Sequence, residues 1–140
     1  MNPVFADTFY LLALLNEEDE GHLRAKAAAA RARQQRRVLV TSAWVLTELG
    51  DALAAVESRG SFLAMLDTLR SDRMVTIVEQ ASQVFEAGVQ LYRSRPDKNW
   101  SLTDCTSFVV MKERGITEAL TADHHFEQAG FTALLQQRPA

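Results

Sequence analysis

Short apolar runs alternate along the chain with longer segments that are apolar on one side only. The runs Val4–Ala6, Val38–Ser42 and Met74–Val78 have the length of buried strands, and those at 119–123 and 131–135 are similar. The spacing of apolar residues predicts helices over 9–15, 19–35, 43–57, 61–70, 80–93 and 100–113, and a helical turn over 124–130. This alternation predicts an α/β fold whose mostly parallel sheet is covered by helices on both faces.

Breaks in the pattern set the ends of several helices. Gly60 separates two of the predicted helices, and Gly115 stops the helix that precedes the fourth strand. Segment 94–99 is polar and contains a proline, so it is the clearest loop. The chain has no long linker or internal repeat, and 140 residues suit one domain, which we expect to span residues 1–140.

Composition indicates the cellular compartment in which the protein is expected to act. A single cysteine, Cys105, rules out an internal disulfide and favours a reducing compartment. No run approaches the ~18 apolar residues of a membrane span, and the first residues lack the basic start of a signal peptide. We therefore expect a cytoplasmic protein without a membrane partner.

Positive charge is concentrated in one helix. The formal charge of −3 argues against attraction of nucleic acid by the whole surface, yet residues 24–37 contain six Lys or Arg residues and no acid. Lys26, Arg33 and Arg37 share one face if the helix extends that far. This face is either solvated or a binding site for RNA phosphates, and the pattern leaves both open.

Four acidic residues occur where a sheet of this kind would gather them. Asp7 follows the first strand, Glu48 lies on the helix after the second, Asp104 lies in the first turn of a helix, and Asp123 follows the fourth strand. Ligands of open parallel sheets bind outside the carboxyl ends of the strands, so we expect these acids at one edge. Simpler explanations exist. Ser101 and Asp104 form a capping pattern, and Asp7 could cap the next helix. Glu48 could pair with an arginine.

Carboxylates that lie close together need a cation. Two like charges ~5 Å apart repel by roughly 3 kcal/mol at an effective dielectric of ~20. Oxygen ligands of this kind suit Mg²⁺ or Mn²⁺, and we expect Asp7, Asp104 and Asp123 to hold the ion. An ion there could activate water and neutralise the charge that develops on a phosphodiester oxygen, so hydrolysis of a nucleic-acid backbone is the leading chemistry.

Several short motifs resemble those of a known family. These motifs are similar to those of PIN-domain ribonucleases, and more narrowly of VapC-type toxins from bacterial toxin–antitoxin pairs. They are Phe5–Thr8, Thr47–Leu49, Trp100–Cys105 with Ser107 and Phe108, and Leu120–Asp123 with Phe126. The resemblance covers nearly the whole chain. It implies a three-layer α/β/α fold and a metal-dependent endoribonuclease whose acidic set is Asp7, Glu48, Asp104 and Asp123.

The resemblance also implies further residues and partners. Thr8 and Thr121 match hydroxyl positions that arrange metal, water or phosphate. Such toxins form homodimers, are blocked by a small antitoxin and cut a structured RNA such as tRNA. The chain departs from the family at Phe9, where many relatives carry a hydroxyl, and at His124, where many carry arginine. His124 could therefore make an RNA contact that depends on pH.

Other interpretations compete with the nuclease. A cysteine hydrolase would need Cys105 near a histidine, yet this thiol is expected to face the core. Zinc could use Asp123, His124 and His125, but adjacent histidines on a helical turn are expected to point apart. A phosphoacceptor would need a second acid after Asp7 and a lysine after Asp123, and neither is present. The main alternative is a non-catalytic module that binds nucleic acid or protein.

Overall fold

The computed structural model describes residues 2–136, which form five strands and seven helices. Met1 and residues 137–140, which the single-domain prediction includes, lie outside the described residues. The strands are β1 (Val4–Ala6), β2 (Leu39–Ser42), β3 (Val75–Val78), β4 (Glu118–Leu120) and β5 (Thr132–Ala133). The helices are α1 (Thr8–Leu15), α2 (His22–Gln34), α3 (Ala43–Ala52), α4 (Arg59–Ser71), α5 (Ser82–Ser94), α6 (Leu102–Glu113) and α7 (His124–Gln128). None of these helices combines the length and apolar character needed to cross a membrane.

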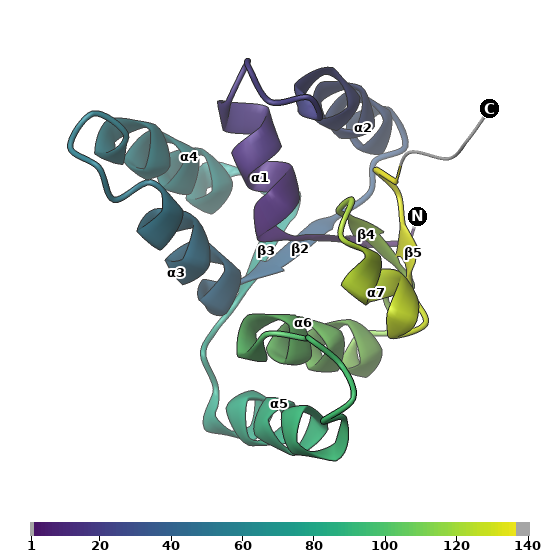
Figure 1. The fold of residues 1–140 in the computed structure, drawn as a ribbon. Coiled ribbons are helices and arrows are strands. Elements are labelled where there is room, and N and C mark those ends of the chain that lie inside the picture. The colour runs from purple at the N-terminus through teal and green to yellow at the C-terminus, as the bar shows by residue number, and fades with distance from the viewer. Residues whose placement is uncertain (1, 137–140) are drawn as a thin grey trace.

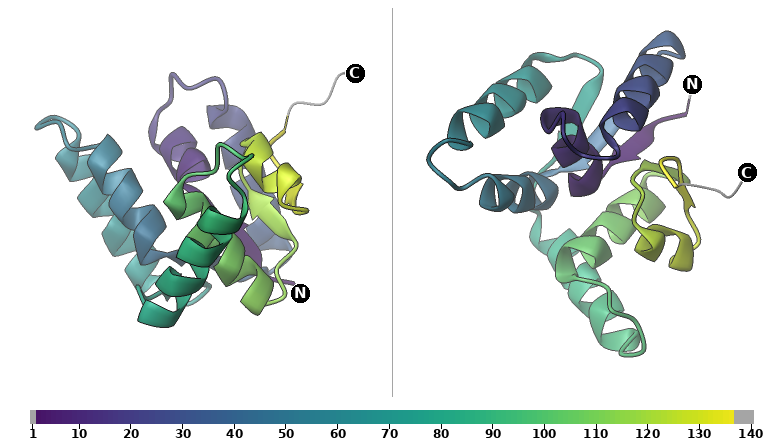
Figure 2. Two further views of the ribbon diagram at one scale, coloured as in Figure 1. Left: turned by 60° about the horizontal axis from the view of Figure 1, so that its bottom comes forward. Right: turned by 45° about the horizontal axis from the view of Figure 1, so that its top comes forward.

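The strands form one sheet in the order β3-β2-β1-β4-β5, and every neighbouring pair runs parallel. Figure 1 shows α1 and α2 on one side of this sheet and α5 and α6 on the other. Both views of Figure 2 show α3 beside α4 and α5 beside α6. The predicted α/β/α fold is confirmed, and the sheet expected to be mostly parallel is parallel throughout the described residues. Parallel strands bring the carboxyl ends of β1, β2 and β4 to one edge.

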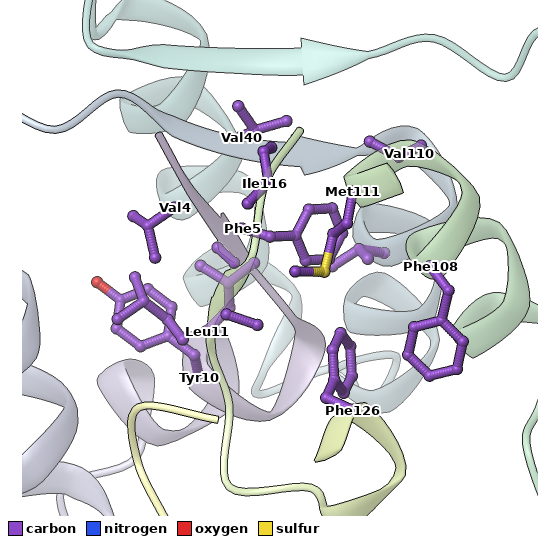
Figure 3. Close-up of a cluster of buried hydrophobic side chains, with 14 of the residues drawn as sticks. Val4, Phe5, Tyr10, Leu11, Val40, Phe108, Val110, Met111, Ile116 and Phe126 are labelled. Atoms are coloured by element: carbon purple, nitrogen blue, oxygen red, sulfur yellow. The ribbon is translucent and has the colours of Figure 1, made fainter. Parts of the chain in front are cut away.

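Buried aromatic rings join the elements that meet at this edge. The ring of Phe108 on α6 lies edge-on to that of Phe126 on α7, with centroids 5.0 Å apart. Phe126 in turn lies 6.3 Å from Phe5 on β1 (Figure 3). All three side chains are buried in the core. Because close-packed interiors resist deformation, this cluster holds β1, α6 and α7 in a fixed relation.

The region between α3 and α4 differs from the sequence prediction. The spacing of apolar residues predicts a helix that continues to residue 57, but α3 ends at Ala52, and Val56 is 86% exposed. The backbone N–H and guanidinium Nε of Arg59 donate to the carbonyls of Ala55 and Ala54, which stabilises a turn instead. Gly60 therefore lies inside α4 rather than between two helices. Periodicity alone did not reveal this turn.

Two local features fix α6 as the sequence predicts. Ser101 and Asp104 form a reciprocal capping box at its start. Gly115 follows its end with a φ of 66°, in the left-handed region that favours glycine.

Helix α5 packs closely against α6 at Gly88. A Cβ at this position would lie 2.7 Å from Cγ2 of Thr106 on α6. The absence of a side chain lets α5 approach α6 closely.

Candidate active site

The four predicted acids lie around the carboxyl edge of the sheet. Asp7 follows β1, Asp123 follows β4 at the start of α7, Asp104 lies in the first turn of α6, and Glu48 lies on α3 after β2. Their charges act on one another. Asp104 and Glu48 both raise the pKa of Asp7, and Asp123 raises the pKa of Asp104. The structure thus brings these side chains together, as the strand order predicts.

Asp7 is the most deeply buried of the four acids. Burial away from water raises the pKa of its carboxyl to about 7, and the negative charges of Asp104 and Glu48 act in the same direction. The Thr121 hydroxyl opposes the rise by donating a hydrogen bond to Oδ2 of Asp7 at 3.0 Å. The Asp7 side chain does not cap α1. Helix capping therefore does not explain why this acid is buried.

Asp104 and Asp123 do cap helices. Oδ2 of Asp104 accepts the backbone N–H of Ser101, and Oδ1 of Asp123 accepts that of His125, each at about 3 Å. In residues 2–136, the other carboxylate oxygen of each makes no hydrogen bond with protein groups. One oxygen of each acid is fixed by its helix, and the second is available to a ligand.

His125 is a site residue that the sequence indicated only as a possible zinc ligand. Its Nδ1 lies 3.0 Å from Oδ2 of Asp104 and 3.4 Å from Oδ1 of Asp123. The prediction that the two adjacent histidines point apart is wrong, because the rings of His124 and His125 are 4.6 Å apart. One feature of the sequence could have identified His125. Asp123 is the N-cap of α7, and an N-cap carboxylate accepts the backbone N–H of the residue two positions later, which is His125.

Two buried hydroxyls beside the acids have no hydrogen-bond partner among the described residues. They belong to Thr8, which directly follows Asp7, and to Ser107, three residues after Asp104 on the same face of α6. Buried polar atoms without a partner are uncommon, and they indicate a site for water or another ligand. Thr8 was expected from the sequence. Ser107 was not, although its spacing from Asp104 was a signal for it.

The residues present fit a divalent cation. In the described part of the chain, no lysine or arginine forms an ion pair with Asp7, Glu48, Asp104 or Asp123. Partly buried carboxylates without such partners favour a bound cation, because burial of uncompensated charge is costly. Carboxylate oxygens suit Mg²⁺ or Mn²⁺. Ligand atoms of Asp123, His124 and His125 also lie within 4.8 Å of one another, and their ring nitrogens favour a transition metal.

Two of the predicted RNA contacts, Arg33 and Arg37, lie at the amino ends of the strands, opposite the acids. Arg37 donates to the carbonyls of Asn2 and Pro3 and to the carboxylate of Glu118, at the amino ends of β1 and β4. Arg33 lines a hollow with residues at the amino ends of β2 and β3, and Lys26 is exposed on α2. His124 does lie at the acidic edge, with Nδ1 3.7 Å from Oδ1 of Asp123. RNA contact by these four residues stays a prediction.

Cys105 does not have the setting of a nucleophile. It is fully buried on α6, and burial raises the pKa of its thiol to about 11. A thiol with such a pKa carries almost no thiolate near neutral pH, and thiolate is the reactive form. The cysteine-hydrolase interpretation therefore has no support in the structure.

Comparison with known proteins identifies relatives along most of the chain. The model of the PIN domain matches residues 4–132. The 23S rRNA-specific endonuclease VapC20 of Mycobacterium tuberculosis is 29% identical over 128 residues, which are 91% of this chain and 95% of that protein. The family match at residues 4–132 covers every element that carries one of the four acids.

Solved structures share the same architecture. The crystal structure of Mycobacterium tuberculosis VapC20, described as a sarcin–ricin loop cleaving toxin, matches with a TM-score of 0.81, at 28% identity over 97% of this chain and 99% of that one. FitAcB from Neisseria gonorrhoeae matches with a TM-score of 0.68 at 16% identity, over 95% of this chain and 96% of that one. VapBC2 from Rickettsia felis, bound to promoter DNA, matches over the same shares with a TM-score of 0.66 at 13% identity. The last two show the fold alone.

Proposed function

The chain belongs to the PIN-domain family, and from this premise we propose that it is a metal-dependent endoribonuclease that hydrolyses phosphodiester bonds in RNA. The observation that carries the proposal is the set of four carboxylates at one edge of the sheet, of which Asp7 is buried without a basic partner in the described residues. Such a set is costly unless a cation occupies it. The similarity to an endonuclease supports the same reaction.

Asp7, Asp104 and Asp123 are the residues that would hold Mg²⁺ or Mn²⁺. A divalent ion in such a site supplies charge neutralisation at the phosphodiester and lowers the pKa of bound water. The ring nitrogen of His125 beside Asp104 and Asp123 favours Mn²⁺ over Mg²⁺, since imidazole ligands suit transition metals better. Thr121 fixes the Asp7 carboxylate by hydrogen bonding, and the unpaired Thr8 hydroxyl is available to water or phosphate.

Glu48 has a different role from the three aspartates. Its side chain is half-buried on α3, and within residues 2–136 its carboxylate makes no hydrogen bond to protein groups. A carboxylate in this condition can accept a proton from water that attacks the phosphate. We assign Glu48 to proton transfer and water positioning.

The names of the relatives support the proposed RNA substrate and antitoxin partner. VapC20 is named for 23S rRNA and described as cleaving the sarcin–ricin loop, so this loop is the first RNA to test, beside tRNA. VapC20 is also described as a toxin, which supports a toxin of a toxin–antitoxin pair that a small antitoxin protein inhibits. A homodimer and action in the cytoplasm, where ribosomal RNA and tRNA occur in bacteria, complete the proposal.

A non-catalytic binding module is the second candidate. One observation favours it: the carboxylates of Asp104 and Asp123 cap α6 and α7, so a purely structural role would explain two of the four acids. It leaves the burial of Asp7 and the two unpaired hydroxyls without a cause. We therefore rank it below the nuclease.

Mapping of cleavage sites tests the proposed function. Purified protein, free of antitoxin, would be incubated with total bacterial RNA and Mn²⁺, Mg²⁺ or EDTA, and new 5′ ends would be located by primer extension. We expect discrete metal-dependent ends that Asp7→Asn abolishes. Asp51→Asn, which removes an exposed acid from the same helix as Glu48, should cut normally. No cleavage by folded protein that also takes up no Mn²⁺ would favour the binding module.

A further inference from the structure

A hollow of about 660 Å³ lies where α5 passes into the loop before α6. Its lining includes Tyr92 and Arg93 at the end of α5, and Lys98, Asn99 and Trp100 from the loop. Figure 1 shows that α5 lies outside α6, away from the sheet. We call the group formed by Tyr92, Arg93 and Lys98 the Tyr92 surface.

Positive charge on the Tyr92 surface exceeds negative charge, although the carboxylate of Asp97 acts on Lys98. Arg93 and Lys98 form no ion pair with any residue in the described part of the chain. Arg95 differs, because it pairs with Asp97 at 3.1 Å and its guanidinium lies 5.2 Å from the centre of the Trp100 ring. No acidic residue lines the hollow. On a chain with a formal charge of −3, this concentration of positive charge is a local exception.

An exposed aromatic ring lines the same hollow as these charges. The Tyr92 side chain is 55% exposed, whereas Trp100 is only 6% exposed. Tyrosine rings with free faces are the platforms on which unpaired bases of RNA stack. A cationic groove that follows the backbone, together with an aromatic platform for bases, is the usual composition of a site for single-stranded nucleic acid.

The surface is rigidly connected to the acids. Ser101, which follows the loop, donates its backbone N–H to Asp104, and its hydroxyl accepts that of Asp104. Trp100 Nε1 donates to Oε1 of Gln128 on α7, the helix that Asp123 caps. Lys98 is thus only a few residues from a capping box that contains a proposed metal ligand. RNA held on the Tyr92 surface would have a fixed position relative to the acids.

We propose that the Tyr92 surface binds an unpaired segment of the RNA substrate beside the cleavage site. Arg93 and Lys98 contact successive phosphates, and a base stacks on Tyr92. This inference rests on the proposed function and assigns its substrate contacts to α5 and the α5–α6 loop rather than to α2. A second copy of the chain is a poor occupant, because a symmetric contact through this surface would bring like charges together.

Binding measurements on an inactive background test the surface independently of cleavage. The probe is a fluorescein-labelled 12-nucleotide oligouridylate, and its anisotropy would be measured with Asp104→Asn protein at several salt concentrations. We expect Arg93→Ala and Lys98→Ala each to weaken binding and to reduce the slope of log K against log salt by about 0.7. Tyr92→Ala should weaken binding about five- to one-hundred-fold, and Tyr92→Phe should restore it, because stacking needs only the ring.

Arg73→Ala is the matched control, since Arg73 is an exposed cation just before β3, at the amino edge of the sheet. It should leave affinity and salt dependence unchanged. In the active protein, Arg93→Ala and Lys98→Ala should raise KM for total RNA more than they change kcat. Equal affinity in all variants would overturn the inference, as would a loss of dimer by Tyr92→Ala at unchanged RNA affinity. Failure of the proposed function would give a different result. Protein that retains Asp104 would not cut RNA, whichever residues occupy the Tyr92 surface.

Discussion

One hydroxyl joins the first and the last of the four acids. Thr121 Oγ1 donates a hydrogen bond to Oδ2 of Asp7 at 3.0 Å and accepts the backbone N–H of Asp123 at 3.0 Å. Thr121 is fully buried just after β4. Because both bonds use the same oxygen, the orientation of the Asp7 carboxylate depends on the backbone that carries Asp123.

Thr121→Val should therefore weaken metal binding without a large change in shape. Valine has a similar volume, but it leaves Asp7 without its hydrogen bond. Residues that orient metal ligands typically contribute 10- to 100-fold to metal affinity or activity, so we expect a Kd for Mn²⁺ roughly 10-fold higher by calorimetry. Thr121→Ser keeps the hydroxyl and should restore affinity. Equal affinities of the valine variant and the wild type would contradict this role.

The free energy of unfolding of the metal-free protein should fall as pH rises toward neutrality. The pKa of Asp7 is about 7 in the folded protein, against 3.8 for an exposed aspartate. Between these values the folded state binds more protons than the unfolded state, so stability decreases with rising pH. The contribution is complete below pH 3.8 and is lost above about pH 7. With about 1.4 kcal/mol for each pH unit, the loss is a few kcal/mol.

Urea unfolding at pH 5 and pH 8 in EDTA measures this loss. Asp7→Asn should have a flatter profile and should be more stable than the wild type at pH 8. Mn²⁺ should increase the stability of the wild type at pH 8, because it binds the folded state only. The same pH dependence in Asp7→Asn and wild-type protein would assign the effect to another group.

His125→Ala should weaken metal binding more than His124→Ala does. His125 lies 3.0 Å from the Asp104 carboxylate and is largely enclosed, with 20% of its side chain exposed, whereas the His124 side chain is 68% exposed. Removal of the His125 ring frees two acids that it holds in place. Calorimetry with Mn²⁺ should show a roughly 10-fold loss for His125→Ala. Equal losses in both variants would contradict a specific role of His125.

Gly88→Ala should destabilise the contact between α5 and α6. The new methyl group would lie 2.7 Å from Cγ2 of Thr106, within α6 packed against the sheet. Forced overpacking costs roughly 1–3 kcal/mol, which urea unfolding can detect. Gly60→Ala is the control on α4, where an added Cβ meets nothing within 4 Å. It should be neutral or slightly stabilising, because alanine favours helix over glycine. A stable Gly88→Ala protein would show that α5 can shift.

The sequence predicted the elements whose signals are local. Apolar runs that end on Asp7 and Asp123 located two strands, and the Ser101 and Asp104 spacing located the start of α6 through a capping box. The order of strands and helices then placed the acids at one edge. These predictions succeeded because burial, capping and parallel connection each depend on residues close in sequence.

Features that depend on specific side-chain contacts, or on contacts distant in sequence, could not be predicted in this way. The end of α3 at Ala52 follows from a turn that Arg59 stabilises, although the apolar spacing continues to Val56. The ion pair between Arg37 and Glu118 depends on the pairing of β1 with β4. His125 reaches Asp104 across the space between α6 and α7, and no spacing within either segment specifies that distance.

The rate of RNA cleavage as a function of Mn²⁺ concentration, in the wild type and in Asp104→Asn, tests the central claim most directly. The side-chain oxygen of asparagine can still accept the backbone N–H of Ser101, so this change removes the charge while it keeps the capping box at the start of α6. We predict that the wild-type rate rises with Mn²⁺, saturates and vanishes in EDTA. The folded variant should be at least ~100-fold slower. Equal rates in the two proteins, or cleavage that continues in EDTA, would contradict a metal-dependent nuclease built on these four acids.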